Sequence, residues 1–296
     1  MSAPLRLATR GSPLALAQAT SVAAHLGAVG IASELVIVET EGDRRRDVDL
    51  VELAGRGVFT KEVQAAVLDG RADVAVHSAK DLPAVTPTGL VLASVPERHD
   101  AADALVGKPL RVLGPGATVA TGAPRRRALL LAERPDLQIV PLRGNIATRL
   151  EAVGTDGIEA VVVAVAALER LGLGGRVAER LDPARFVPQV GQGAIALECA
   201  VGSDVFDRLA EIDDAAAHRA LRCERGFLAA LGAGCDLPGG AHATCDGDAV
   251  TLRAVLMTDD GSTVVRGIDV DSDPERAGRA LASRLRRELD GAAGAA

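Results

Sequence analysis

The chain has 296 residues, a formal net charge of −7 and 48% hydrophobic residues, an ordinary composition for two or three soluble domains. Aromatic residues make up only 1%, which argues against recognition of single-stranded nucleic acid by base stacking. The net charge gives no global field that attracts polyanions, and no apolar run approaches the roughly 20 residues of a membrane helix. Because the start also lacks a secretory signal pattern, the sequence predicts a cytoplasmic protein that binds neither nucleic acid nor membrane.

The first predicted strand, Leu5–Thr9, leads through Arg10 and Ser12 into a helix that begins at Pro13. Ser12 is a favourable N-cap, and proline suits the first helical position. The free backbone N–H groups of a helix start, next to an arginine, form a candidate anion site. The alternative is a plain capped helix with a surface arginine.

A second strand is predicted at Leu35–Val38, and a helix at Phe59–Leu68. The polar, glycine-punctuated stretch 40–57 between them predicts a long loop. The apolar run that follows, Val74–Val76, changes abruptly into His-Ser-Ala-Lys-Asp, which predicts a buried strand ending in a polar loop. Ligands of open α/β sheets bind beyond the carboxyl ends of strands, so Asp81 is a candidate for chemistry. The alternative is that Asp81 caps a turn and Lys80 is merely solvated.

A second α/β lobe follows the polar connection 96–103, a possible crossover between domains. Its strands are predicted at Thr118–Thr121, Gln138–Leu142 and Ile158–Val165, the last suited to a buried parallel sheet. Asn145 is a candidate N-cap for the helix that carries Arg149. Arginines follow these strand ends as they follow the first strand: Arg10, Arg125 with Arg126, Arg143 with Arg149, and Arg170. Arginine binds carboxylates and phosphates bidentately, so the set predicts a ligand with several such groups.

A second crossing, Pro188–Gly193, precedes a strand at Ala194–Cys199 and a helix at Ala215–Leu231. Three strands and a helix from about Pro274 to Leu289 then predict a small α+β domain, with the terminal Gly-Ala repeat frayed. The predicted fold is α/β with two hinged lobes and this C-terminal domain. The predicted boundaries are 1–96 with 193–212, 99–190, and 214–296.

Cys235 lies among glycines in the loop after the last-but-one helix, which predicts an open thiol suited to covalent attachment or nucleophilic work. The alternative is a small residue that fills a tight loop. The cysteines at 199, 223 and 245 lie within regular elements and are interpreted as packing residues. No CxxC pair or His/Cys cluster has metal-ligand spacing, so no metal is predicted, and no phosphate-binding or dinucleotide-binding glycine motif occurs.

Taken together, the open cysteine, the loop carboxylate and the arginines resemble the hydroxymethylbilane synthase (porphobilinogen deaminase) family. The matching stretches are Leu5–Ala19, Gly55–Glu62, Ala72–Pro83, Pro124–Arg127, Leu142–Leu150, Val161–Leu173, Val190–Cys199 and Leu231–Gly240. The resemblance implies two lobes like those of periplasmic binding proteins and a third domain that carries the cofactor cysteine. It implies a monomeric transferase of tetrapyrrole (haem) biosynthesis that condenses four porphobilinogen molecules into hydroxymethylbilane. It also implies a dipyrromethane cofactor, joined through a thioether to Cys235.

The resemblance also assigns roles to single residues. Asp81 aligns with the catalytic aspartate, which stabilises the cationic azafulvene formed by deamination. The cofactor-binding candidates are Lys80, Ser12, Thr121, Arg125 and Arg126. The substrate-binding candidates are Arg10, Arg143, Arg149, Arg170, Phe59 and Gln192. Thr121 is followed here by Gly-Ala-Pro where many members have serines, so anion binding there would depend on Thr121 and backbone N–H groups.

Two other classes remain open at this point. The two-lobed layout would also suit a solute-binding protein for a polycarboxylate, although no export signal is visible and the open cysteine has no use there. The arginines could serve an oligonucleotide binder, against which the acidic net charge and the lack of aromatic residues argue.

Overall fold

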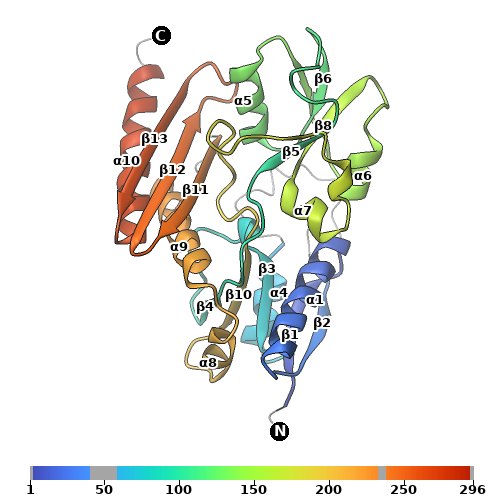
Figure 1. Ribbon diagram of the computed structural model, residues 1–296. Coiled ribbons are helices and arrows are strands. Elements are labelled where there is room, and N and C mark those ends of the chain that lie inside the picture. The colour runs from blue at the N-terminus through green and yellow to red at the C-terminus, as the bar shows by residue number, and fades with distance from the viewer. Residues whose placement is uncertain (1–2, 41–58, 233–237, 294–296) are drawn as a thin grey trace. The chain divides into compact units, whose positions relative to one another are not determined.

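The computed structural model describes residues 3–40, 59–232 and 238–293 (Figure 1). Contacts between residues divide the chain into two units, which are described separately. The first unit holds Met1–His99 and Ala194–Leu221, and the second holds Asp100–Gly193 and Arg222–Ala296. The chain therefore passes between units near both predicted crossings and again within the helix α9, Ala215–Leu231.

The first unit is built on a five-stranded sheet with the order β2-β1-β3-β10-β4. The strands are β1 (Leu5–Arg10), β2 (Ser33–Val38), β3 (Val74–Ser78), β4 (Leu90–Ser94) and β10 (Ile195–Ala200). β1 runs parallel to β2 and β3, whereas β10 runs antiparallel to both β3 and β4. The carboxyl ends of β1, β2 and β3 therefore lie at one edge of this sheet.

Helices cover both faces of this first sheet because side chains alternate along each strand. Leu5 and Leu7 share a core with α1 (Pro13–Ala28) and α8 (Val205–Ala210), whereas Ala8 shares a core with α4 (Lys61–Leu68). The structure confirms the predicted start of α1: Ser12 is its N-cap and accepts a hydrogen bond from the N–H of Ala15 at 3.3 Å.

The second unit contains a five-stranded sheet with the order β7-β6-β8-β5-β9. Its strands are β5 (Asp103–Gly107), β6 (Thr118–Ala120), β7 (Gln138–Val140), β8 (Ile158–Ala164) and β9 (Glu179–Arg180). β8 is buried as predicted, but its sheet is mixed and not parallel, since β8 runs parallel to β6 and antiparallel to β5. Asp103, the first residue of β5, pairs with Ala164, the last residue of β8, and therefore lies at the carboxyl end of β8.

The helices of this sheet again lie on both faces. α5 (Pro124–Glu133) contributes to a core with Val119 and Val162. α6 (Ile146–Glu151) and α7 (Val165–Arg170) contribute to the opposite core, with Ala120 and Val161. All three helices begin soon after a strand of the sheet, so their first turns lie at its carboxyl edge.

The second unit also contains an antiparallel three-stranded sheet of β11 (Gly239–Asp246), β12 (Ala249–Met257) and β13 (Val264–Asp271). The helix α10 (Pro274–Ala293) packs along one face, where a Cβ at Gly267 would lie 2.7 Å from Leu281 (Figure 1). On the other face, Val255 and Met257 share a core with α5. α10 continues to Ala293, so the predicted helix end near Leu289 was wrong; residues 294–296 of the terminal stretch predicted to fray lie outside the described residues. Within the described residues, no helix is long and apolar enough to span a membrane.

Hydrogen bonds attach each of the two crossings to the first unit at one end and to the second unit at the other. On the first crossing, the N–H of Val95 donates to Asp213 at 2.7 Å within the first unit. Asp100 accepts from Nη2 of Arg180 at 2.8 Å within the second.

On the second crossing, the N–H of Gly191 donates to the fully buried carboxylate of Glu224 at 2.7 Å, and the other oxygen of Glu224 accepts from the N–H of Ala243 at 2.8 Å. On the first-unit side, the carbonyl of Ala194 accepts from the N–H of Ala79 at 3.0 Å. Both crossings are therefore tied to their units by hydrogen bonds within a few residues of the unit boundaries.

Candidate active site

Asp81 lies where the sequence predicts, just beyond the carboxyl end of β3. Residues Ala79–Asp81 form a single 3₁₀ turn, and the N–H of Ala79 donates to the carbonyl of Ala194, the residue just before β10. Behind the turn, the hydroxyl of Ser78 and the buried side-chain amide of Gln18 on α1 hydrogen-bond at 2.8 Å. The side chain of Asp81 is exposed and makes no hydrogen bond or ion pair with the residues that the structure describes. Its carboxylate therefore caps no turn there and is open to a ligand.

Arg10 and Ser12, the candidates at the end of β1, lie at the same carboxyl edge of the first sheet as Asp81. The guanidinium of Arg10 lies over the ring of Phe59, with its central carbon 4.3 Å from the ring centroid. Such cation–π pairs are worth about 0.5–1 kcal/mol at exposed sites, so Phe59 holds Arg10 in place. Phe59 is a predicted substrate-binding residue, and here Arg10 covers one face of its ring. Ser12 uses its oxygen to cap α1, and Lys80 is half-buried.

A buried polar cluster joins β3, β10 and α4, and no sequence pattern predicts it. Glu198 on β10 is fully buried and accepts a hydrogen bond from the side-chain amide of Gln64 at 2.7 Å. His77 of β3 lies 3.4 Å from the same carboxylate. Because unpartnered buried charges are costly, these contacts hold β3 and β10 in one arrangement directly beneath the site.

In the second unit, Arg125 and Arg126 come from the first turn of α5 and meet Asp103. Arg125 Nη2 lies 2.6 Å from Oδ2 of Asp103, and Arg126 Nη2 lies 2.7 Å from its Oδ1. The side-chain amide of Gln192 donates to the same Oδ1 at 2.8 Å. Both arginines are only 6% exposed and Asp103 is 1% exposed. The structure thus brings together three predicted residues, but around a buried carboxylate that the sequence analysis had not singled out.

This buried cluster, Asp103 with Arg125, Arg126 and Gln192, carries one positive charge in excess. Burial alone would raise the pKa of Asp103, but the charges of the two arginines and the hydrogen bonds from Arg126 and Gln192 outweigh it. The pKa of Asp103 is therefore held well below its usual range. Burial lowers the pKa of Arg125, and the charge of Asp103 opposes this shift. The remaining Nη1 groups donate to the carbonyls of Val187 and Val162 at 2.7 and 3.0 Å. Within the cluster the two arginines are held rigidly, and their excess charge favours anions at this edge.

Three further predicted site residues lie at the same carboxyl edge of the second sheet. Thr121 is buried beyond β6, and its hydroxyl oxygen accepts from the N–H of Ala123 at 3.3 Å. Arg143 follows β7 and is half-buried, and Arg149 of α6 donates from Nε to the carbonyl of Gly144 at 2.9 Å. The predicted cap of α6 is confirmed, since the side chain of Asn145 accepts from the N–H of Thr148 at 3.0 Å.

Arg170, the last residue of α7, has an unused hydrogen-bond donor. Its Nη2 donates to the carbonyl of Gly193 at 2.8 Å, whereas its Nε is buried and has no hydrogen-bond partner among the described residues. Burial lowers the pKa of Arg170 to about 10, so the guanidinium remains charged at neutral pH. A buried cationic donor without an acceptor is costly, and a carboxylate would satisfy it. This observation fits a ligand with carboxylate arms, such as the dipyrromethane that the resemblance implies.

Cys235 and the stretch 41–58 lie outside the described residues. Cys199 and Cys223 are fully buried and Cys245 is half-buried, as predicted for packing residues. Burial raises the pKa of Cys223 to about 12, so its thiol is unreactive at neutral pH. Among the residues that the structure describes, no group of three or more His, Cys, Asp or Glu could hold a metal ion.

Comparisons with known proteins agree along almost the whole chain. The family model "Porphobilinogen deaminase, dipyromethane cofactor binding domain" matches residues 5–207, and "Porphobilinogen deaminase, C-terminal domain" matches residues 218–287. A porphobilinogen deaminase from Rubrobacter xylanophilus is 45% identical over 96% of this chain and 94% of its own length. One from Acidothermus cellulolyticus is 44% identical over 96% of this chain and 88% of its own.

The solved structures that match are more distant. A periplasmic substrate-binding protein from Coxiella burnetii has a TM-score of 0.42 at 13% identity and covers 75% of this chain and 96% of its own. A nutrient binding protein from Burkholderia cenocepacia has a TM-score of 0.43 at 13% identity and covers 70% of this chain and 90% of its own. The two family models and the relatives at about 45% identity decide the assignment: the chain belongs to the porphobilinogen deaminase family.

Proposed function

We propose that this chain condenses four porphobilinogen molecules head to tail into hydroxymethylbilane, with release of ammonia, and acts as a transferase of tetrapyrrole and haem biosynthesis. The observation that carries the proposal is family membership over nearly the full length, including the cofactor-binding domain that contains Asp81. Its cofactor is a dipyrromethane joined to Cys235. When bound, this group supplies the pyrrole ring to which the first substrate is joined.

Asp81 is the catalytic residue of this proposal. Loss of ammonia from porphobilinogen leaves a positive charge that spreads over the pyrrole ring and its nitrogen. An exposed carboxylate on a turn that follows β3 and is hydrogen-bonded to Ala194 can accept a hydrogen bond from the pyrrole N–H and stabilise that charge. At about 4 Å and an effective dielectric constant of about 20, the attraction is worth roughly 4 kcal/mol before desolvation costs. That energy corresponds to a rate factor of about 10³ at most.

The arginines neutralise the acetate and propionate arms of the substrate and of the growing chain. Arg170 offers its unpartnered Nε, and Arg10 is held over Phe59 at the edge to which Asp81 belongs. Arg143 and Arg149 follow at the carboxyl edge of the second sheet. Ser12 and Lys80 remain proposed cofactor contacts in the first unit.

Arg125, Arg126 and Gln192 are assigned here mainly to positioning. They are buried around Asp103, and their excess positive charge attracts the carboxylates of the cofactor and substrate without exposing either guanidinium. Thr121 adds a buried hydroxyl beside this cluster. Direct contacts from Arg125, Arg126 and Thr121 to the cofactor, and from Gln192 to the substrate, as the resemblance implies, remain part of the proposal.

We further propose the three-domain division 1–96 with 193–212, 99–190, and 214–296. The chain is proposed to act as a cytoplasmic monomer that binds neither nucleic acid nor membrane. Light scattering coupled to size exclusion tests the monomer, and a mass twice that of the 30.3 kDa chain would refute it.

The decisive experiment is the intact mass of the protein, purified from cells able to make porphobilinogen. We expect a covalent adduct on the wild type, no adduct on Cys235→Ser, and discrete mass increments after porphobilinogen is added. A bare polypeptide in the wild type would contradict the proposal. Saturable binding of porphobilinogen without increments or ammonia release would instead favour a solute-binding protein for polycarboxylates.

A further inference from the structure

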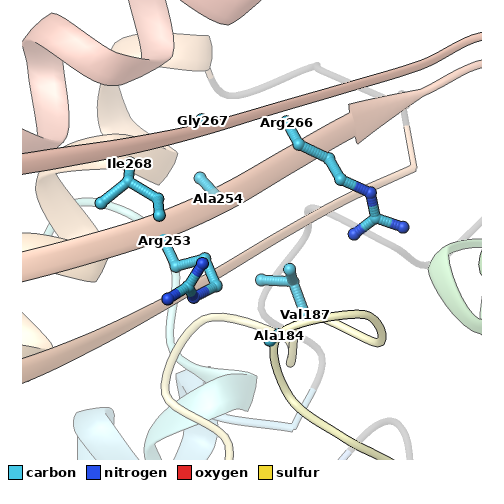
Figure 2. Close-up of a pocket in the computed structure, with 7 residues that line it drawn as sticks. All are labelled: Ala184, Val187, Arg253, Ala254, Arg266, Gly267 and Ile268. Carbon is cyan, nitrogen blue, oxygen red and sulfur yellow. The ribbon is translucent and has the colours of Figure 1, made fainter.

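A pocket of about 370 Å³ lies in the second unit, apart from the residues assigned to the candidate active site. One wall is the β12–β13 face of the three-stranded sheet, and the other is the segment that contains Ala184 and Val187 (Figure 2). The sheet contributes Arg253 and Arg266 from neighbouring strands, together with Ile268, which pairs with Arg253 across the strands. The volume falls in the range of about 300–1,000 Å³ that is usual for small-molecule sites.

The charges around this pocket are not balanced. Arg253 is half-buried and makes no hydrogen bond or ion pair with any residue in the described part of the chain. Arg266 donates to the carbonyl of Arg185 at 2.8 Å and lies 3.9 Å from Glu133, a carboxylate that also pairs with Arg185. The guanidinium groups of Arg185 and Arg266 thus share the carboxylate of Glu133, while Arg253 has no ion pair among the described residues. Burial lowers the pKa of Arg266, Glu133 opposes that shift, and the charge of Arg185 adds to it.

Apolar side chains form the rest of the lining. Val187, Ala254, Ala184 and Ile268 border the space, and Figure 2 shows the two guanidinium groups on opposite sides of Val187. Ile268 remains 47% exposed, so its side chain is accessible to an occupant of the pocket. An apolar lining with a few convergent charged donors is the usual composition of a site for a small organic anion.

We propose that this pocket binds a small organic acid, whose carboxylate pairs with Arg253 and whose apolar body lies against Val187 and Ile268. Val187 connects the pocket to the buried cluster, because its side chain lines the pocket while its carbonyl accepts a hydrogen bond from Arg125 at 2.7 Å. A bound acid therefore contacts Val187, the residue whose carbonyl helps to position Arg125. The site is independent of the proposed function and could be tested even if that function were wrong.

Ligand-observed fluorine NMR on the holoenzyme tests this proposal, with 4-(trifluoromethyl)benzoate as the probe and 4-(trifluoromethyl)benzamide as its neutral counterpart. We expect saturable binding of the acid and binding of the amide at least about tenfold weaker, because the charge-assisted hydrogen bond is lost. Arg253→Met should weaken binding of the acid by a similar factor. Ala184→Phe, which fills the pocket from the exposed segment, should also weaken it.

Arg279→Met is the matched control. Arg279 is exposed on α10, has no partner among the described residues and does not line the pocket, so the same loss of charge should leave binding unchanged. Absence of saturable binding, or equal affinity in the wild type and in both pocket variants, would overturn the proposal. Binding that is lost in Arg170→Met but retained in Arg253→Met would also overturn it, because the probe would then occupy the candidate active site.

Discussion

Asp103→Asn should be the most destabilising conservative substitution in the buried cluster. The carboxylate is 1% exposed and bridges two guanidinium groups at 2.6 and 2.7 Å. Asparagine keeps the shape but removes the charge, and its NH₂ group must face an arginine or glutamine donor. Removing one partner of a buried ion pair costs about 3–5 kcal/mol, a large part of a typical stability of about 5–15 kcal/mol. We therefore expect the free energy of unfolding to fall by about 3–5 kcal/mol at pH 7.

The pH dependence gives the same prediction a second readout. The pKa of Asp103 is lower in the folded state than in the unfolded state. Its carboxylate therefore contributes its full free energy to folding above the unfolded-state pKa of about 3.9, and this stabilisation is lost as the pH falls toward the folded-state pKa. The difference in stability between wild type and Asp103→Asn should thus be constant between pH 5 and 7 and become smaller below about pH 4.

Urea unfolding followed by far-ultraviolet circular dichroism is the suitable assay, because the chain has no Trp or Tyr for fluorescence. Asp136→Asn is the matched control, since Asp136 pairs with Arg134 at 2.6 Å on the surface, where water screens the charges. Asp136→Asn should lower the free energy of unfolding much less than Asp103→Asn does. A loss below about 1 kcal/mol for Asp103→Asn, or a difference from the wild type that does not change in acid, would refute the reasoning.

Three further predictions concern the site. Asp81→Ala should lower kcat by about a hundredfold or more while the intact mass still shows the cofactor, and a change of less than tenfold would remove Asp81 from the reaction. Arg170→Gln should raise KM for porphobilinogen about tenfold, because it removes the unpartnered Nε donor together with the hydrogen bond to Gly193; an unchanged KM would argue against substrate binding. Gly144→Ala should lower the unfolding free energy in urea by about 1–3 kcal/mol, because Gly144 has φ +101° and an added Cβ would lie 2.9 Å from Thr148; an unchanged midpoint would contradict this.

The local elements could be predicted well because their signals are local. The Ser12 cap, the proline at the start of α1 and the Asn145 cap each depend on residues within three positions of one another, and the structure has all of them. The position of Asp81 after β3 follows equally from a short apolar run that ends in polar residues.

The partners within the site depend on contacts across long stretches of sequence. Asp103 meets Arg125 and Arg126, 22 and 23 residues later, only because β5 runs antiparallel to β8 and brings its first residue to the carboxyl edge of the sheet. The sequence pattern placed Asp103 at the end of a connection and predicted a parallel sheet around β8. Arg10 and Phe59 likewise meet only in the folded first unit.

The hydrogen bonds that fasten the two crossings restrict where the backbone can pivot. On the second crossing, Gln192 is held to Asp103 and Ala194 to the turn that carries Asp81, so Gly193 is the single residue between two fixed points. Its φ of +86° is a conformation that glycine adopts without strain, and its carbonyl accepts from Arg170. On the first crossing only residues 96–99 lie between Val95 and Asp100. Any bending between the units must therefore be absorbed by these few residues and by the third passage of the chain, within α9, and an anion that pulls on Arg170 acts directly on Gly193.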